Sequence, residues 1–179
     1  MDPDALVGRV ADVALSCLVT KGYAATTLDG IAEAACLPEA EVRALVGDEE
    51  GLMAHLAGPL LAALGDVLAS AAAVEVRGPA SLRPLIEGYM DALVAHRRLV
   101  TVVLSDRAAT TSPAVGALRR AMLDLAEQLA RATGDRVDNR IRAASALGAV
   151  HTAVLEMADL DAATVRGVIV DASVAILLT

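Results

Sequence analysis

Residues 22–52, GYAATTLDGIAEAACLPEAEVRALVGDEEGL, decide the fold of this chain. The stretch contains two short amphipathic helical patterns joined by a tight connection, and a third helical pattern starts after Asp48. Two short helices joined in this way form a helix-turn-helix arrangement, in which the second helix normally enters the major groove of DNA. The sequence therefore predicts a helix-turn-helix unit near its start.

The charges of this segment conflict with that arrangement. The predicted second helix carries Glu39 and Glu41, and the next helix opens with Asp48, Glu49 and Glu50. Residues 1–57 hold ten acidic and three basic side chains, and ten minus three gives −7 of the chain's net charge of −8. Cations normally supply much of the affinity for DNA. Acids are also common at helix starts for dipole reasons, but this alternative does not explain the missing cations.

The segment resembles the tetracycline-repressor (TetR) family of transcriptional regulators. The resemblance covers residues 10–52 and begins with an apolar first helix, VADVALSCLVTKG. The matching positions that follow are Gly22, Tyr23, Thr26, Thr27, Ile31, Ala32, Ala35, Val42, Val46 and Leu52. The resemblance implies an all-α dimeric protein that binds double-stranded DNA and a small-molecule effector.

The departures from the family pattern fall mainly on positions that contact DNA. The family usually has Gly in the turn and a capping Ser, where this chain has Cys36 and Pro38. After the small residue Ala40, Glu41 stands where the family usually has Thr, and Arg43 replaces a phosphate-contacting Tyr. Val46 replaces an aromatic residue, and Glu49 replaces a Lys. The candidate DNA-contact residues are therefore Thr27, Glu39, Glu41, Arg43 and Glu49. Only Arg43 and backbone N–H groups near Thr27 are suited to a phosphate.

Composition predicts the fold class. Hydrophobic residues make up 56% of the 179 residues, with two Tyr and no Phe or Trp, so the core consists of Ala, Leu and Val. Ala and Leu favour helix. We expect an all-α fold of about nine helices. A helix-turn-helix domain of residues 1–47 would precede a ligand-binding and dimerisation domain of residues 48–179.

The last two predicted helices, about residues 137–157 and 161–178, indicate a homodimer. The first is rich in small residues, and the second is apolar nearly all round. Such a helix must be buried on every side, and a second copy of the chain can cover it. The alternative is burial within one monomer. The interface candidates are Ile141, Gly148, Val165, Val168, Ile169, Ala172 and Ile176.

Asp171 is the one charge in residues 167–178. If it is buried, it needs a partner such as Arg140, Arg142 or a backbone N–H of the neighbouring helix. The alternative is a position at the solvent-exposed rim of the interface.

The resemblance also implies an effector cavity among the later helices. Polar groups and adaptable Met side chains lie there among apolar residues, an arrangement that suits a hydrophobic or amphipathic ligand. The candidates are Tyr89, Met90, Leu93, His96, Met122, Leu125, His151 and Leu155. The alternative is that these side chains simply fill the core.

Other classes of function lack support in the sequence. It has no G-x-S-x-G, G-x-x-x-x-G-K-[ST] or H-E-x-x-H motif, and its three His residues are isolated. We therefore expect no enzyme activity, metal or cofactor. The acidic start and the short apolar run broken by Asp171 predict a cytoplasmic protein without a membrane partner.

The sequence thus predicts a TetR-like, dimeric, small-molecule-responsive transcriptional repressor. The alternative is a regulator-derived protein that has lost DNA binding and acts as a ligand- or protein-binding module.

Overall fold

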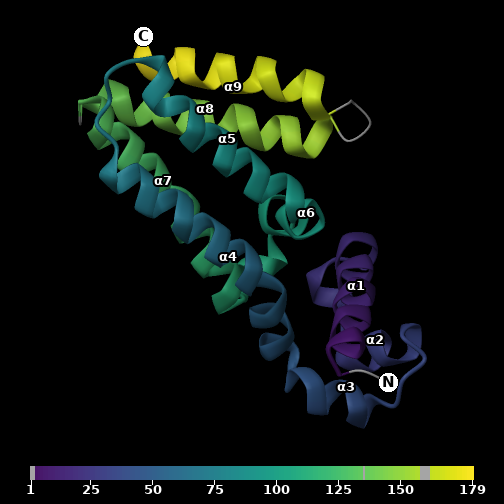
Figure 1. The fold of residues 1–179 in the computed structure, drawn as a ribbon. Coiled ribbons are helices and arrows are strands. Elements are labelled where there is room, and N and C mark those ends of the chain that lie inside the picture. Colours follow the sequence, from purple (N-terminus) through teal and green to yellow (C-terminus); the bar gives the residue numbers. More distant parts are fainter. Residues whose placement is uncertain (1–2, 135, 158–161) are drawn as a thin grey trace. The chain divides into compact units, whose positions relative to one another are not determined.

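The computed structural model describes residues 3–134, 136–157 and 162–179 (Figure 1). Within these ranges the chain forms nine α-helices and two short 3-10 helices, with no strand. The elements are α1 (Pro3–Lys21), η1 (Tyr23–Ala25), α2 (Leu28–Ala34), α3 (Glu39–Val46), α4 (Glu49–Ala73), α5 (Pro79–Ala95), α6 (Arg97–Ser105), η2 (Ala108–Thr111), α7 (Pro113–Thr133), α8 (Val137–Glu156) and α9 (Ala162–Leu178). The expectation of an all-α fold is confirmed.

Local signals explain the helix ends. Pro79 occupies the first turn of α5 directly after Gly78, which suits a residue that has no N–H to donate. Gly47 follows α3 with a φ of 79°, a left-handed conformation that favours glycine. The expected start of the last helix at Asp161 lies outside the described residues.

Contacts divide the chain into two compact units. The first unit contains residues 1–59 and 98–118, and the second contains residues 60–97 and 119–179. The helix-turn-helix segment therefore shares its unit with most of α6, with η2 and with the start of α7. The functional division into residues 1–47 and 48–179 stays a prediction.

The core of the first unit is built from small and branched aliphatic side chains. Val10, Ala14, Leu28, Val42 and Val100 are fully buried. In this core α1 packs on α2, and α2 packs on α3. Because the fully buried side chains there are aliphatic and small, close helix approach has to bury the apolar surface.

In the second unit, α9 packs on both α8 and α5. Figure 1 shows α8 and α9 side by side, and Ser173 on α9 is fully buried between neighbouring helices. Its hydroxyl donates to the carbonyl oxygen of Ala146 on α8 at 3.1 Å, which satisfies the buried polar group.

Among the described residues, α4 is a helix whose length and mean hydropathy of 1.6 would allow it to cross a membrane. Core helices of soluble proteins meet the same criterion. Leu52, Met53, Leu60 and Leu64 of α4 are buried within the protein.

Candidate functional sites

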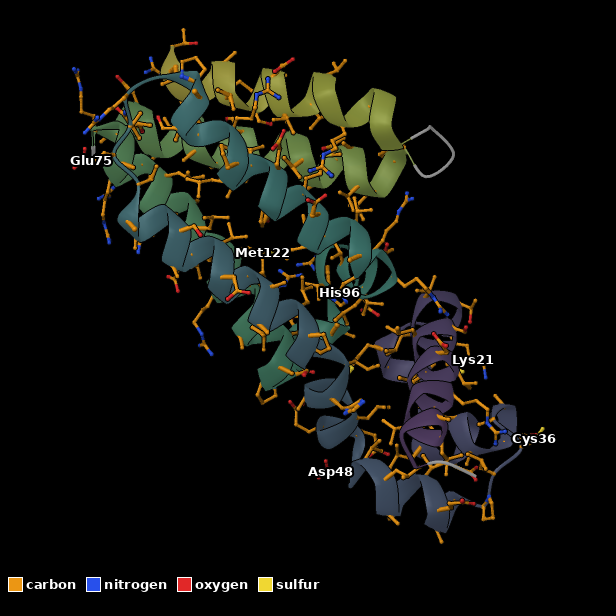
Figure 2. The ribbon with its side chains drawn as sticks, viewed as in Figure 1. Lys21, Cys36, Asp48, Glu75, His96 and Met122 are labelled. Atoms are coloured by element: carbon orange, nitrogen blue, oxygen red, sulfur yellow. The ribbon has the colours of Figure 1, made fainter. Side chains whose placement is uncertain are left out.

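The turn between α2 and α3 has the geometry of a helix C-terminal cap. Cys36 adopts a φ of 52°, and its N–H donates to the carbonyl of Glu33 at 3.1 Å. The N–H of Leu37 donates to the carbonyl of Ala32 at 2.9 Å, which completes a Schellman motif. The side chain of Cys36 projects outward (Figure 2). The left-handed backbone explains why a glycine suits this position.

Side-chain caps begin the helices on either side of this turn. The hydroxyl of Thr27 accepts the N–H of Gly30 at 3.2 Å and so caps α2. The carboxylate of Asp48 accepts the N–H of Gly51 at 2.7 Å at the start of α4. Asp48 therefore has a local structural role in addition to its charge.

The surface of α3 is acidic and exposed. Thr27, Glu39, Glu41, Arg43 and Glu49 are all exposed to solvent. Arg43 donates to the carboxylate of Glu39 at 2.6 Å, one helical turn away, and this hydrogen bond and charge raise the pKa of Arg43. The cation expected to meet a phosphate is thus already paired with an anion of the same helix.

Two carboxylates connect segments of the first unit that are distant in sequence. Asp106 accepts the N–H of Tyr23 at 2.6 Å and the N–H of Ala108 at 2.8 Å. The bond from Tyr23 is the main cause of a lowered pKa for Asp106. Glu50 accepts the hydroxyl of Ser112 at 2.9 Å and the N–H of Ala114 at 3.1 Å.

Sequence reasoning missed these two connections. An Asp before a short helix is a recognisable capping signal, so the bond from Ala108 could have been anticipated. The partner Tyr23 lies 83 residues away along the chain, and no local pattern identifies it.

The ligand-pocket candidates belong to the second unit. The hydroxyl of Tyr89 on α5 hydrogen-bonds to Nε2 of His151 on α8, and their ring centroids are 5.7 Å apart. Burial raises the pKa of Tyr89 and lowers the pKa of His151, so the pair favours the neutral form of both groups. Two side chains predicted to line one site are therefore in contact.

The remaining pocket candidates differ in burial. Met90, Leu93, Met122 and Leu125 are buried, whereas His96 and Leu155 are half-buried. His96 lies at the end of α5 (Figure 2). A hollow of about 280 Å³ in this unit is lined by other residues, Leu123, Ala126, Glu127 and Arg140. A role of the eight candidates in ligand binding stays a prediction.

The outer faces of α8 and α9 expose apolar side chains. Val168 is 67% exposed and Ile141 is 62% exposed. Ala172 is exposed, and Gly148, Val165, Ile169 and Ile176 are half-buried, so none of the interface candidates is fully buried in the monomer. A Cβ at Gly148 or Gly167 would meet no atom within 4 Å. Packing within one monomer therefore does not require a glycine at either position.

Charged pairs border this face where α9 meets α5. Asp171 pairs with Arg83, and the Asp171 side chain is 64% exposed. Arg166 on α9 makes two hydrogen bonds to the carboxylate of Asp91 on α5, the longer of them 3.0 Å. This exposure fits the alternative of a solvent-exposed position for Asp171. Its partner is Arg83 of α5, and not Arg140, Arg142 or a backbone N–H of α8, which were the partners expected for a buried Asp171.

No group of three or more metal-ligating His, Cys, Asp or Glu side chains occurs in the described ranges. Cys17 is buried and Cys36 is exposed, and both are free thiols.

No protein-family model and no curated protein matches the sequence. Solved structures do match. A TetR-like transcriptional regulator from Rhodococcus sp. RHA1 superposes with a TM-score of 0.71 at 17% identity, over 97% of this chain and 96% of its own.

Two further structures give the same result. The fatty acid degradation regulator FadR from Bacillus halodurans has a TM-score of 0.69 at 14% identity, over 94% of each chain. A TetR-family member from Streptomyces coelicolor A3 has a TM-score of 0.69 at 23% identity, over 94% of this chain and 89% of its own. At these identities the likeness concerns the fold, and it extends over nearly the whole chain: the protein has the all-α fold of the TetR-family transcriptional regulators.

Proposed function

We propose that this protein is a cytoplasmic, homodimeric transcriptional repressor of the TetR type that responds to a small molecule. The observation that carries the proposal is the exposed apolar face of α8 and α9 on a chain with this fold. Val168, Ile141 and Ala172 are solvent-exposed in the monomer, and a symmetric second copy would remove them from water.

The open space beside Gly148 supports the same assembly. In a helix pair built across a two-fold axis, small residues let the two backbones approach closely. Because the space beside Gly148 and Gly167 is open within one monomer, a partner helix could occupy it. The ion pairs of Asp171 and Arg166 with α5 would then lie at the solvent-exposed rim.

The effector would bind in the second unit, beside Tyr89 and His151. The pair offers a partly buried hydrogen-bonding position, and Met90, Leu93 and Met122 are buried apolar side chains of the same unit. Such a site suits a mainly apolar ligand with one polar group. Tyr89→Phe and His151→Phe would each remove one polar partner while keeping an aromatic ring.

A second candidate function is a ligand- or protein-binding module that has lost DNA binding. The ion pair between Arg43 and Glu39 favours this candidate, since it neutralises the cation expected to contact phosphate. The exposed carboxylates of Glu41 and Glu49 would in addition repel a DNA backbone.

The experiment that separates the two candidates measures binding to duplex DNA taken from upstream of the protein's own gene. Mobility shifts would be recorded over a series of salt concentrations, with a scrambled duplex of the same length as control. A repressor should bind the upstream duplex in preference to the scrambled one. Equal or absent binding of both duplexes at low salt would reject the repressor and leave the binding module.

A further inference from the structure

A pocket of about 200 Å³ lies in the first unit, where α1, η1, α2 and the start of α4 meet. Leu18, Ile31, Leu52 and Met53 line it and are themselves nearly inaccessible to solvent, so they form its inner wall. The half-buried Tyr23 and Thr26 also line it and add a phenol and a hydroxyl group. Ala24 of η1 and Glu49 of α4 also line it and are exposed, so they belong to its mouth. The pocket is separate from the ligand candidates around Tyr89, which belong to the second unit.

We propose that this pocket binds a small aromatic or branched alkyl ammonium ion, with the apolar group inside and the cation beside Glu49. The four aliphatic and thioether side chains of the inner wall offer an environment for an apolar group and none for a charge. A carboxylate at the mouth favours a cation at that end of the ligand.

The three consecutive acidic residues around the mouth, Asp48, Glu49 and Glu50, would repel an anionic ligand. Asp48 and Glu50 flank Glu49 in sequence, but each has a structural partner, because Asp48 caps Gly51 and Glu50 bonds to Ser112 and Ala114. The charge of Glu49 contributes to the raised pKa of Arg43, but the guanidinium of Arg43 is hydrogen-bonded to Glu39, and Glu49 lines the pocket. Glu49 is therefore the carboxylate available to a bound cation.

The volume limits the size of the apolar group. An apolar cavity of about 150 Å³ is known to hold a benzene ring. A pocket of about 200 Å³ therefore accommodates a single ring or a similar branched alkyl group, whereas a fused multi-ring or long-chain group would not fit entirely inside it. Benzylammonium combines a ring of this size with a cation one carbon away.

The first experiment titrates the full-length protein with benzylammonium and, separately, with neutral benzyl alcohol. The thermal midpoint and the NMR resonance of the Met53 methyl group would be followed. We expect benzylammonium to raise the midpoint and to shift the Met53 resonance in a saturable manner, because a ligand that binds only the folded state stabilises it. Benzyl alcohol, which lacks the charge, should bind more weakly.

Three variants assign the effect to the pocket. Glu49→Gln should weaken benzylammonium binding about two- to fivefold, the factor expected for an exposed ion pair. Glu41→Gln removes the same charge from α3 outside the pocket and should leave the affinity unchanged. Ala24→Leu adds volume at the exposed mouth and should abolish saturation without requiring any change to the buried wall.

Specific outcomes overturn the proposal. Absence of a saturable Met53 shift in the native protein would reject the site itself. Equal affinity for benzylammonium and benzyl alcohol, or equal losses from Glu49→Gln and Glu41→Gln, would reject the cation. Unchanged binding by a folded Ala24→Leu variant would place the ligand elsewhere.

Discussion

Two solvent-exposed faces of the molecule differ in polarity. The outer face of α8 and α9 carries apolar side chains, whereas the exposed face of α3 carries charged ones. The first exposes Val168 and Ile141, which are costly to leave in water. The second exposes Glu39, Glu41 and Arg43, which water solvates well. Under the proposed function a second copy of the chain would cover the first face, whereas the second can remain in contact with water.

This difference separates fold from partner chemistry. The helix-turn-helix geometry depends on buried Leu28, Ile31 and Val42 and on the capped turn at Cys36, and none of these contacts is affected by the charges outside. A chain can therefore keep this geometry while the net charge of its exposed side chains changes from positive to negative. The proposed dimer face would have no such freedom, because burial of its apolar side chains would drive the association.

The largest effect should follow from placing a charge on the apolar face. Val168→Arg would bury an unpaired guanidinium in each protomer of a dimer, at a cost of about 3–5 kcal/mol. We expect the dissociation constant of the dimer to rise more than a hundredfold, as measured by light scattering over a dilution series.

Val94→Arg is the matched control, because Val94 is an exposed apolar residue on α5 outside the proposed face. This variant should remain dimeric. If the native protein is monomeric at tens of micromolar, the proposal that a second copy covers the apolar face of α8 and α9 is wrong.

The second prediction concerns the acidic residues of α3 and of the start of α4, which are replaced by neutral and basic ones. The double variant Glu41→Thr and Glu49→Lys raises the charge of each protomer by +3, the sum of +1 and +2, and that of a dimer by +6. We expect clear, salt-sensitive DNA binding, with the slope of log affinity against log salt steeper by about one unit for each new phosphate contact.

The native protein should show little non-specific binding at low salt in the same assay. A native protein that binds an operator tightly at physiological salt would show that the exposed acids do not prevent DNA binding. Backbone N–H groups and uncharged side chains would then be sufficient for the contact.

The sequence predicted the helices well because their signals are local. The start of a helix at about Val137 and the boundary after Gly47 follow from local residue types and from helical periodicity. Apolar periodicity also placed Val168 and Ile141 on the helices whose outer faces are exposed.

Contacts between distant segments could not be predicted in this way. The bond from Tyr23 to Asp106, the bonds from Ser112 and Ala114 to Glu50, and the pairing of Asp171 with Arg83 each join residues more than 60 positions apart. Their geometry depends on how helices pack, and helical periodicity identifies a buried face without identifying the helix that covers it.

The third prediction tests one of these distant contacts. Asp106→Ala removes the acceptor for the N–H groups of Tyr23 and Ala108 and should lower the free energy of unfolding by about 1–2 kcal/mol. Denaturant unfolding would measure the loss. Asp66→Ala, at an exposed position of α4, is the control and should have little effect.

The same contact should depend on pH. The folded state lowers the pKa of Asp106 below its ordinary value of about 3.9, so the ionised carboxylate stabilises the fold above that value. This contribution should be lost as the pH falls through the lowered pKa. The stability difference between the native protein and Asp106→Asn should therefore shrink in acid, and a constant difference would contradict the assignment.

The fourth prediction concerns the turn that both candidate functions share. Cys36→Gly should stabilise the protein by up to about 1 kcal/mol, because glycine adopts the left-handed backbone without the cost that a Cβ imposes. Cys36→Ala keeps a Cβ and removes the thiol, so it should give no such gain. If both variants stabilised the protein equally, the thiol and not the backbone would be responsible.

The smallest effect should come from the rim of the apolar face. Asp171 is exposed and pairs with Arg83, and exposed ion pairs contribute at most about 1 kcal/mol because solvent screens them. Asp171→Leu should therefore leave the thermal midpoint nearly unchanged, and added salt should weaken the small difference that remains. Arg166→Leu, which breaks the pairing with Asp91 on the same two helices, should behave alike. A large loss of stability from Asp171→Leu alone would mean that the carboxylate is buried in the assembled dimer. The apolar face would then extend across Asp171, and the contrast between an apolar centre and a charged rim would no longer hold.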